Sequence, residues 1–257
     1  MKFYLNLVVI LLLFHIFATK IYAKEQTMAH PIGTANVDLQ LFFPFAEIPV
    51  KDTTVSRPST VLLDVPLISQ MPELPRGCEV TSLAMLLRYK GIAIDKLTLA
   101  KEIKKDPTPY RRSGSAIYFG NPHYGFVGSM TSFREPGFGV FHGPVYELAN
   151  RYLSGNAINL TGSSFETILE HLGQNKPVWV ISTSTFDRVP EQYWQTWQTP
   201  HGPISITYKE HSVLLTGYDN QFVYFNDPLA NIKNRKVPMA SFIRGWEQFG
   251  KQAITYK

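Results

Sequence analysis

The segment from Gly77 to Gly91, GCEVTSLAMLLRYKG, constrains the fold of this chain more than any other. Its apolar residues recur at the spacing of one helical face, and Gly91 supplies a C-terminal stop signal. The segment therefore predicts a buried amphipathic helix. The residues expected on its buried face are Val80, Leu83, Ala84, Leu86 and Leu87, with Thr81, Ser82, Arg88 and Lys90 mainly on other faces.

Cys78, the only cysteine among 257 residues, stands at the first turn of this helix. Unpaired backbone N–H groups and the helix macrodipole favour negative charge at that end, so the position is expected to ease formation of a thiolate. That is where an activated nucleophile is placed. The alternative is a small buried apolar residue, which is the common role of a free cysteine.

Residues 1–23 contain a long apolar run after Lys2 and end at Ala23, which is typical of a secretory signal peptide. The alternative is an uncleaved N-terminal anchor. Residues 24–60 are interpreted as a linker or N-terminal arm, and residues 61–257 as the folded domain. Exported proteins normally use cysteines in disulfide pairs, so a lone Cys78 favours a chemical role over a structural one.

The composition, 44% hydrophobic and 13% aromatic, is sufficient for a substantial core. Removal of residues 1–23 deletes two lysines and no acidic residue, so the net charge falls from +5 to +3. The basic residues are scattered, and we expect no nucleic-acid partner. No pair of histidines, cysteines or carboxylates has metal-ligand spacing and no phosphate-binding loop is present, so no metal or cofactor is predicted.

Hydrophobic patterning predicts helices first and an antiparallel sheet afterwards, an α+β architecture. Further helices are expected at 96–105 after the cap Asp95, at 145–153, at 165–174 with a capping box from Ser163 to Glu166, and from 239. Strands are expected at 62–68, 178–183, 208–218, 221–226 and 252–256, with a hairpin turn at 219–220. Residues 106–139 are expected to form a long functional loop.

A catalytic thiol needs a base, and the base needs a group that orients it. His211 lies on the predicted apolar strand 208–218, and Asp227 follows the next strand. Neighbouring strands of a hairpin lie side by side, so the two side chains are expected within hydrogen-bonding reach. His211 follows Cys78 by 133 residues, a separation typical of papain-like enzymes. Alternatively, His211 is a core histidine and Asp227 a turn residue.

Five motifs in order, GCEVTSLAMLLRYKG, FGNPHYGFVG, KPVWV, EHSVLLTGYDN and FNDPL, resemble the peptidase-like family related to bacteriocin-processing, double-glycine leader cysteine peptidases of the papain-like superfamily. The resemblance implies a papain-like fold with N-terminal helices packed on a C-terminal antiparallel sheet. It also implies Cys78 as nucleophile, His211 as base and acid, and Asp227 as the residue that orients His211. Gln70 matches the family glutamine that donates into the oxyanion hole, and the alternative is an ordinary loop residue.

We therefore expect an exported papain-like cysteine hydrolase that acts on peptide or related amide bonds through an acyl-enzyme. Leader peptidases are cytoplasmic domains fused to exporters, whereas this sequence carries an export signal, so an envelope or secreted peptide is the expected substrate. Membrane contact is expected only through an uncleaved N-terminal segment. The alternatives are an acyltransferase with the same triad and a catalytically silent peptide- or glycan-binding module that uses the cleft or the Trp194 region.

Five other residues are candidates for substrate contact. His123 and His142 are expected to be ordinary surface residues rather than part of a cleft. Tyr193, Trp194 and Trp197 are compatible with either substrate binding or packing on the sheet.

Overall fold

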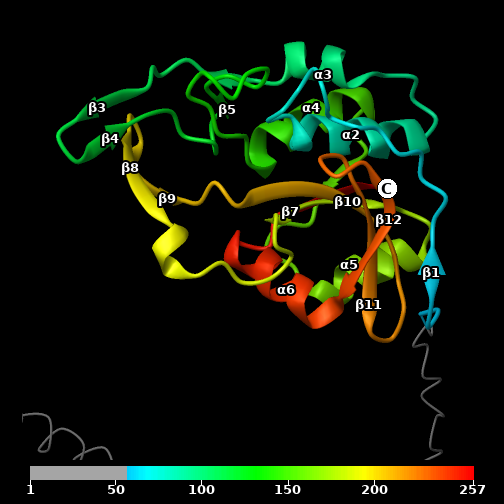
Figure 1. Ribbon diagram of the computed structural model, residues 1–257. Coiled ribbons are helices and arrows are strands. Elements are labelled where there is room, and N and C mark those ends of the chain that lie inside the picture. The colour runs from blue at the N-terminus through cyan, green and yellow to red at the C-terminus, as the bar shows by residue number, and fades with distance from the viewer. Residues whose placement is uncertain (1–56) are drawn as a thin grey trace, which may run out of the picture. The chain divides into compact units, whose positions relative to one another are not determined.

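A computed structural model describes residues 57–257 of the chain (Figure 1). The predicted signal segment 1–23 and most of the predicted arm 24–60 lie outside the described residues. The last residues assigned to that arm contact the domain, since Pro58 O accepts a hydrogen bond of 2.8 Å from Tyr218 Oη. Within the described part of the chain, no helix combines the length and apolar character needed to cross a membrane.

A seven-stranded sheet forms the centre of the domain, and all of its pairings are antiparallel. Its order is β12 (Ile232–Pro238), β11 (Phe222–Asp227), β10 (Glu210–Tyr218), β7 (Val178–Thr183), β13 (Ala253–Tyr256) and β6 (Ala157–Asn159), with β1 (Val61–Leu62) beside β10. Every residue of β7 is buried, as its continuous apolar run predicts. The predicted hairpin is the β10–β11 pair.

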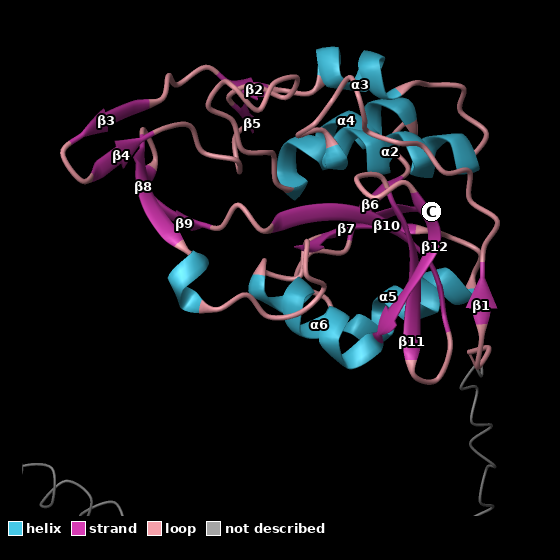
Figure 2. Cartoon of the chain, viewed as in Figure 1, coloured by secondary structure: helices cyan, strands magenta, loops and turns pink. Residues whose placement is uncertain are grey.

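Helices cover both faces of this sheet, as Figures 1 and 2 show. α2 (Cys78–Tyr89), α3 (Lys96–Glu102) and α4 (His142–Tyr152) lie on one face, and α5 (Phe165–Gly173) and α6 (Met239–Gln248) lie on the other. The α+β class is confirmed. The domain is a three-layer arrangement because the apolar sheet has two faces to bury.

α2 is buried at every position from Cys78 to Leu87, so Thr81 and Ser82 are enclosed with the apolar residues, whereas Arg88 and Lys90 are exposed. The helix is enclosed because it packs on β10, α3 and α4. Its small polar side chains are satisfied by backbone oxygens: Thr81 Oγ1 donates to Gly77 O at 2.7 Å, and Ser82 Oγ to Ser212 O at 3.2 Å. Paired in this way, they can be buried at little cost.

The helix caps test the predicted boundaries. Asp95 caps α3 as predicted, because its side chain accepts from Thr98 N at 2.8 Å. The predicted capping box at Ser163 is wrong by one residue. Ser164 caps α5, and its hydroxyl accepts from Thr167 N at 3.2 Å.

The predicted long loop 106–139 contains short strands. β5 (Phe126–Val127) pairs with β2 (Lys105–Asp106). A second, four-stranded sheet joins β3 (Arg111–Ser113), β4 (Ala116–Tyr118), β8 (Gln195–Thr199) and β9 (Gly202–Ile206), with a 3₁₀ turn, η1 (Glu191–Tyr193), ahead of β8. The predicted strand 62–68 is largely wrong, since β1 is only two residues long.

Candidate active site

His211 and Asp227 meet as the hairpin geometry predicts. His211 is the second residue of β10 and Asp227 is the last of β11, and His211 Nε2 lies 2.9 Å from Asp227 Oδ1. Both side chains are almost fully buried, with 3% and 2% exposed. The Asp227 oxygens also accept from Arg235 Nη1 at 2.7 Å, from Leu229 N at 3.0 Å and from Ala230 N at 3.1 Å.

These donors fix the charge of Asp227 and the tautomer of His211. Burial opposes ionisation of Asp227, but hydrogen bonds from His211, the Ala230 N–H and Arg235 outweigh it, so the pKa of Asp227 lies well below its usual range. An ionised Asp227 can only accept, so Nε2 of His211 carries a hydrogen. Nδ1 of neutral His211 is then free to take a proton.

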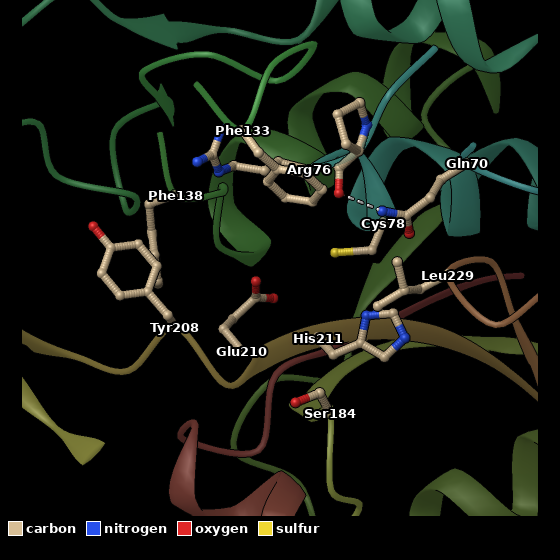
Figure 3. Close-up of a pocket in the computed structure, with 11 residues that line it drawn as sticks. Gln70, Arg76, Cys78, Phe133, Phe138, Ser184, Tyr208, Glu210, His211 and Leu229 are labelled. Atoms are coloured by element: carbon tan, nitrogen blue, oxygen red, sulfur yellow. Dashed lines mark hydrogen bonds between the residues drawn. The ribbon is translucent and has the colours of Figure 1, made fainter. Parts of the chain in front are cut away.

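Cys78 and His211 line one cavity of about 310 Å³ together with Gln70 and Glu210. Figure 3 shows Cys78 above His211 and Glu210, and Arg76, Phe133, Phe138 and Tyr208 continue the cavity wall. Cys78 comes from α2 and His211 from β10, and the packing of α2 on β10 brings them together. Among the described residues, no hydrogen bond joins the sulfur to His211, so the pair is not engaged in this conformation.

The sulfur of Cys78 instead donates to Glu79 Oε2 at 3.3 Å. Burial, followed by the carboxylates of Glu79 and Glu210, raises the pKa of the Cys78 thiol well above its usual value, against a smaller opposing effect from the backbone of Ser212. The expectation that the helix N-terminus would ease thiolate formation is therefore wrong for this arrangement. Cys78 rests here as a neutral, sheltered thiol.

Gln70 lines the cavity and is 2% exposed. Its Nε2 donates one hydrogen to Pro75 O at 2.8 Å, which leaves a second amide hydrogen. The backbone N–H of Gln70 is bound by Pro228 O at 2.9 Å, in the turn that follows Asp227. Gly77 provides no side-chain cap to α2, so no cap side chain competes for the first N–H groups of the helix. Both features suit an oxyanion hole.

Sequence reasoning did not identify Glu79, Glu210 and Arg235 as site residues. Two signals were available in the sequence, because Glu79 follows the cysteine directly within a buried helix and Glu210 precedes His211 on an apolar strand. A carboxylate next to each member of a Cys–His pair is expected to influence both. Arg235 offers no such signal, since it comes from the exposed, mixed pattern of β12.

The other candidates for substrate contact do not line the cavity that contains Cys78. The exposed His123 ring packs edge-on against Phe141, and His142 Nδ1 lies 3.2 Å from Gln252 Oε1. Trp197 is fully buried and donates to Gly120 O at 2.9 Å, which makes it a packing residue. Tyr193 and Trp194 line a separate cavity of about 260 Å³.

A cysteine at the start of a buried helix, facing a histidine and an aspartate on an antiparallel sheet, defines a papain-like arrangement. The sequence model of the peptidase C39-like family matches residues 62–254, and the chain belongs to that family.

Two relatives support this assignment. The uncharacterized protein YvpB of Bacillus subtilis (strain 168) is 47% identical over 194 residues, which cover 75% of this chain and 74% of YvpB. A crystal structure from Bacillus anthracis, described as that of a C39-like peptidase, superimposes with a TM-score of 0.72 at 46% identity, covering 78% of this chain and 98% of the other.

Proposed function

We propose that this protein is an exported cysteine peptidase that cleaves peptide or related amide bonds through Cys78, His211 and Asp227. The observation that supports this most directly is the buried hydrogen bond from His211 to Asp227 beside the cavity that also contains Cys78. Membership of the C39-like peptidase family supports the same reaction class. Gln70 would act as an oxyanion donor.

Acylation follows from the positions of these groups. The proton of Cys78 Sγ passes to His211 Nδ1, and the thiolate attacks the substrate carbonyl carbon. The oxyanion accepts hydrogen bonds from the Cys78 N–H and the Gln70 amide. The His211 imidazolium, held by ionised Asp227, then gives its proton to the leaving amine, and a thioester with Cys78 remains.

Deacylation reverses the roles of the same groups. Water gives a proton to His211 Nδ1 and attacks the thioester carbonyl, and the carboxylic acid product leaves as Cys78 regains its proton from His211. An amine in place of water would give acyl transfer at the same site. The cavity therefore suits both hydrolysis and acyl transfer, and hydrolysis is the simpler proposal.

Peptide libraries test this proposal. We expect the full-length protein to cleave members of a mixed library, with products identified by mass spectrometry, and both Cys78→Ala and His211→Gln to abolish cleavage. Addition of hydroxylamine to the parent should yield hydroxamates, which trap the acyl-enzyme. Cleavage that persists in Cys78→Ala would contradict the assignment of the nucleophile.

A silent binding module is the second candidate, and the observation that favours it is the bond of the thiol to Glu79 rather than to His211. Calorimetric titration of the parent with the same peptides distinguishes a binding module from a peptidase. Binding without turnover or acyl adduct at any pH from 5 to 8 would favour the module, whereas turnover favours the peptidase.

Export is a separate part of the proposal and rests on residues 1–23. N-terminal sequencing of protein recovered outside the cytoplasm of an expressing bacterium should give Lys24 as the first residue. Recovery of the intact N-terminus in the membrane fraction would instead identify an uncleaved anchor, and recovery only from the cytoplasm would refute export.

A further inference from the structure

Glu79 is a fully buried carboxyl that is fixed at several points. Its Oε1 accepts from Val140 N at 2.7 Å, and its backbone oxygen accepts from the indole Nε1 of Trp179 at 2.9 Å. Its Oε2 is left to accept from the sulfur of Cys78 at 3.3 Å. The side chain is thus pre-positioned as a partner for the nucleophile.

Glu210 brings a second carboxyl to the same place. The Cys78 sulfur and one oxygen from each of Glu79 and Glu210 all lie within 4.8 Å of one another. The two carboxyls also converge on Gly139, where an added Cβ would lie 2.3 Å from Glu79 Oε1 and 3.2 Å from Glu210 Oε2. Oε1 of Glu210 is buried without a hydrogen-bond partner. Two carboxylates this close in a buried site do not both ionise at neutral pH.

The charged and titratable surroundings of this pair are few. α2 contributes Cys78, β10 contributes His211, and the rest of the cavity wall contributes Arg76 and Tyr208. Arg76 directs its guanidinium to the backbone oxygens of Ser129 and Ser132. Val140 and Trp179 supply neutral N–H donors. No described cation therefore pairs with the two carboxyls, and a proton is the group that can balance their charge.

The pKa values of Glu79 and Glu210 are shifted in the direction that favours a proton on this pair. Burial raises the pKa of Glu79 to about 7. Burial, and then the charge of Glu79, raises the pKa of Glu210 well above its usual value. Burial and mutual repulsion thus favour a proton on this pair, and Glu79 changes charge near neutral pH.

We propose that Glu79 is a positioning residue that switches Cys78: its carboxylate accepts the thiol hydrogen and keeps the nucleophile at rest, and its protonated form donates to the thiolate and releases the proton of Cys78 to His211. This inference rests on the proposed function in taking Cys78 as the nucleophile. It extends that function by making catalysis depend on a group outside the triad.

The proton balance of the switch is simple. Solvent supplies one proton to Glu79. The thiol proton moves from Sγ to His211 Nδ1, and the new thiolate accepts a hydrogen bond from the Glu79 hydroxyl. The imidazolium keeps its Nε2–H on Asp227. Loss of the Glu79 proton to solvent returns the proton of His211 to the sulfur, and the site is again at rest.

Alkylation of Cys78 by iodoacetamide between pH 5.5 and 8.5 tests this inference. Glu79→Gln keeps an acceptor for Val140 N and presents a permanent amide donor to the sulfur, so it mimics protonated Glu79. Because a group that titrates near pH 7 is about one-tenth protonated at pH 8, we expect Glu79→Gln to react about tenfold faster than the parent at pH 8. The alkylation rate of Glu79→Gln should exceed that of the parent about twofold at pH 7 and should equal it at pH 5.5.

Two control variants locate the effect. Glu147→Gln removes one negative charge from an exposed position of α4, and its Cys78 should be alkylated at the rate of the parent at every pH. Glu210→Gln retains the Glu79 carboxylate and should retain the decline in reactivity between pH 6 and 8. If that decline disappears in Glu210→Gln and persists in Glu79→Gln, the assignment to Glu79 is wrong.

The inference would be overturned if the alkylation rates of Glu79→Gln and the parent differed by the same factor at every pH. A merely structural role changes the reactivity of Cys78 equally at all pH values. Slower alkylation of Glu79→Gln throughout would overturn it too. Alkylation requires no peptide substrate. The predicted ratios without any peptide cleavage would therefore support the switch while contradicting the proposed peptidase, and cleavage with a constant ratio would do the reverse.

Discussion

Asp227→Asn tests whether the buried charge of Asp227 organises the site. The shape of the side chain is kept, but one oxygen becomes a donor. The least costly orientation leaves Oδ1 on His211 Nε2 and the turn N–H groups, and turns Nδ2 toward Arg235, whose side chain is 35% exposed and can turn to water. The substitution then weakens the three remaining hydrogen bonds and loses the fourth.

The magnitude follows from those four contacts. A hydrogen bond to a charged group contributes about 1.5–3 kcal/mol and a neutral one about 0.5–1.5 kcal/mol, so each of the three retained bonds loses about 1 kcal/mol. Loss of the partly exposed Arg235 pair adds up to about 1 kcal/mol. We expect the free energy of unfolding to fall by about 3–4 kcal/mol, measured by urea titration at pH 7 with tryptophan fluorescence.

Asp187→Asn is the matched control, since Asp187 also bridges an arginine. Asp187 binds Arg244 with distances of 2.8 and 2.7 Å, but the two side chains are 43% and 50% exposed. Solvent screens such a pair, so its loss should cost less than about 1 kcal/mol. If Asp227→Asn destabilises the protein no more than Asp187→Asn does, the reasoning about the buried charge is refuted.

Two other contacts and the charge of Asp227 give further predictions. Ser164→Ala should lower the free energy of unfolding by about 0.5–2 kcal/mol in urea titrations, and Ser163→Ala by less than about 0.5 kcal/mol, because only Ser164 caps α5. Gln70→Ala should lower kcat about 10²–10³-fold with little change in KM in steady-state peptide assays. Because the folded pKa of Asp227 is depressed, its stabilising contribution is complete above about pH 4 and is lost as the pH falls. The melting temperature of the parent should therefore fall more steeply from pH 4 to 2 than that of Asp227→Asn.

The elements predicted from sequence are those that bury a continuous apolar pattern. α2, β7 and the β10–β11 hairpin were recognisable because periodicity and turn chemistry agree along each of them. The missed strands lack such a pattern. β3 is Arg111–Ser113, exposed at all three positions, and β12 is partly exposed throughout. Their pairing depends on neighbours distant in sequence, which one short segment does not encode.

The parts of the candidate site that could be predicted are those marked by a residue's place within a single helix or strand. A cysteine that begins a helix, a histidine within an apolar strand and an aspartate at the end of the next strand can be recognised along the chain. The convergence of Glu79 and Glu210 could not be recognised, because it depends on how α2 packs on β10 and on Gly139, which comes from a third segment. The pKa of a buried group follows from such tertiary neighbours rather than from its helix position.

The magnitudes show why the helix N-terminus does not determine the state of Cys78. The macrodipole favours a charge at that end by about 0.3–1 kcal/mol, or about 2 kcal/mol in favourable buried geometries. One ionised carboxylate within 4.8 Å disfavours a thiolate by at least about 3.5 kcal/mol at an effective dielectric constant of about 20, and Glu79 Oε2 lies 3.3 Å from the sulfur. An ionised Glu79 therefore outweighs the helix, and the thiol stays neutral. Protonation of Glu79 removes this repulsion, and the helix N-terminus and the Glu79 hydroxyl are then left to oppose the effect of burial. If the proposed switch holds, the sequence-based expectation applies to the state with protonated Glu79, and the resting structure describes the state with ionised Glu79.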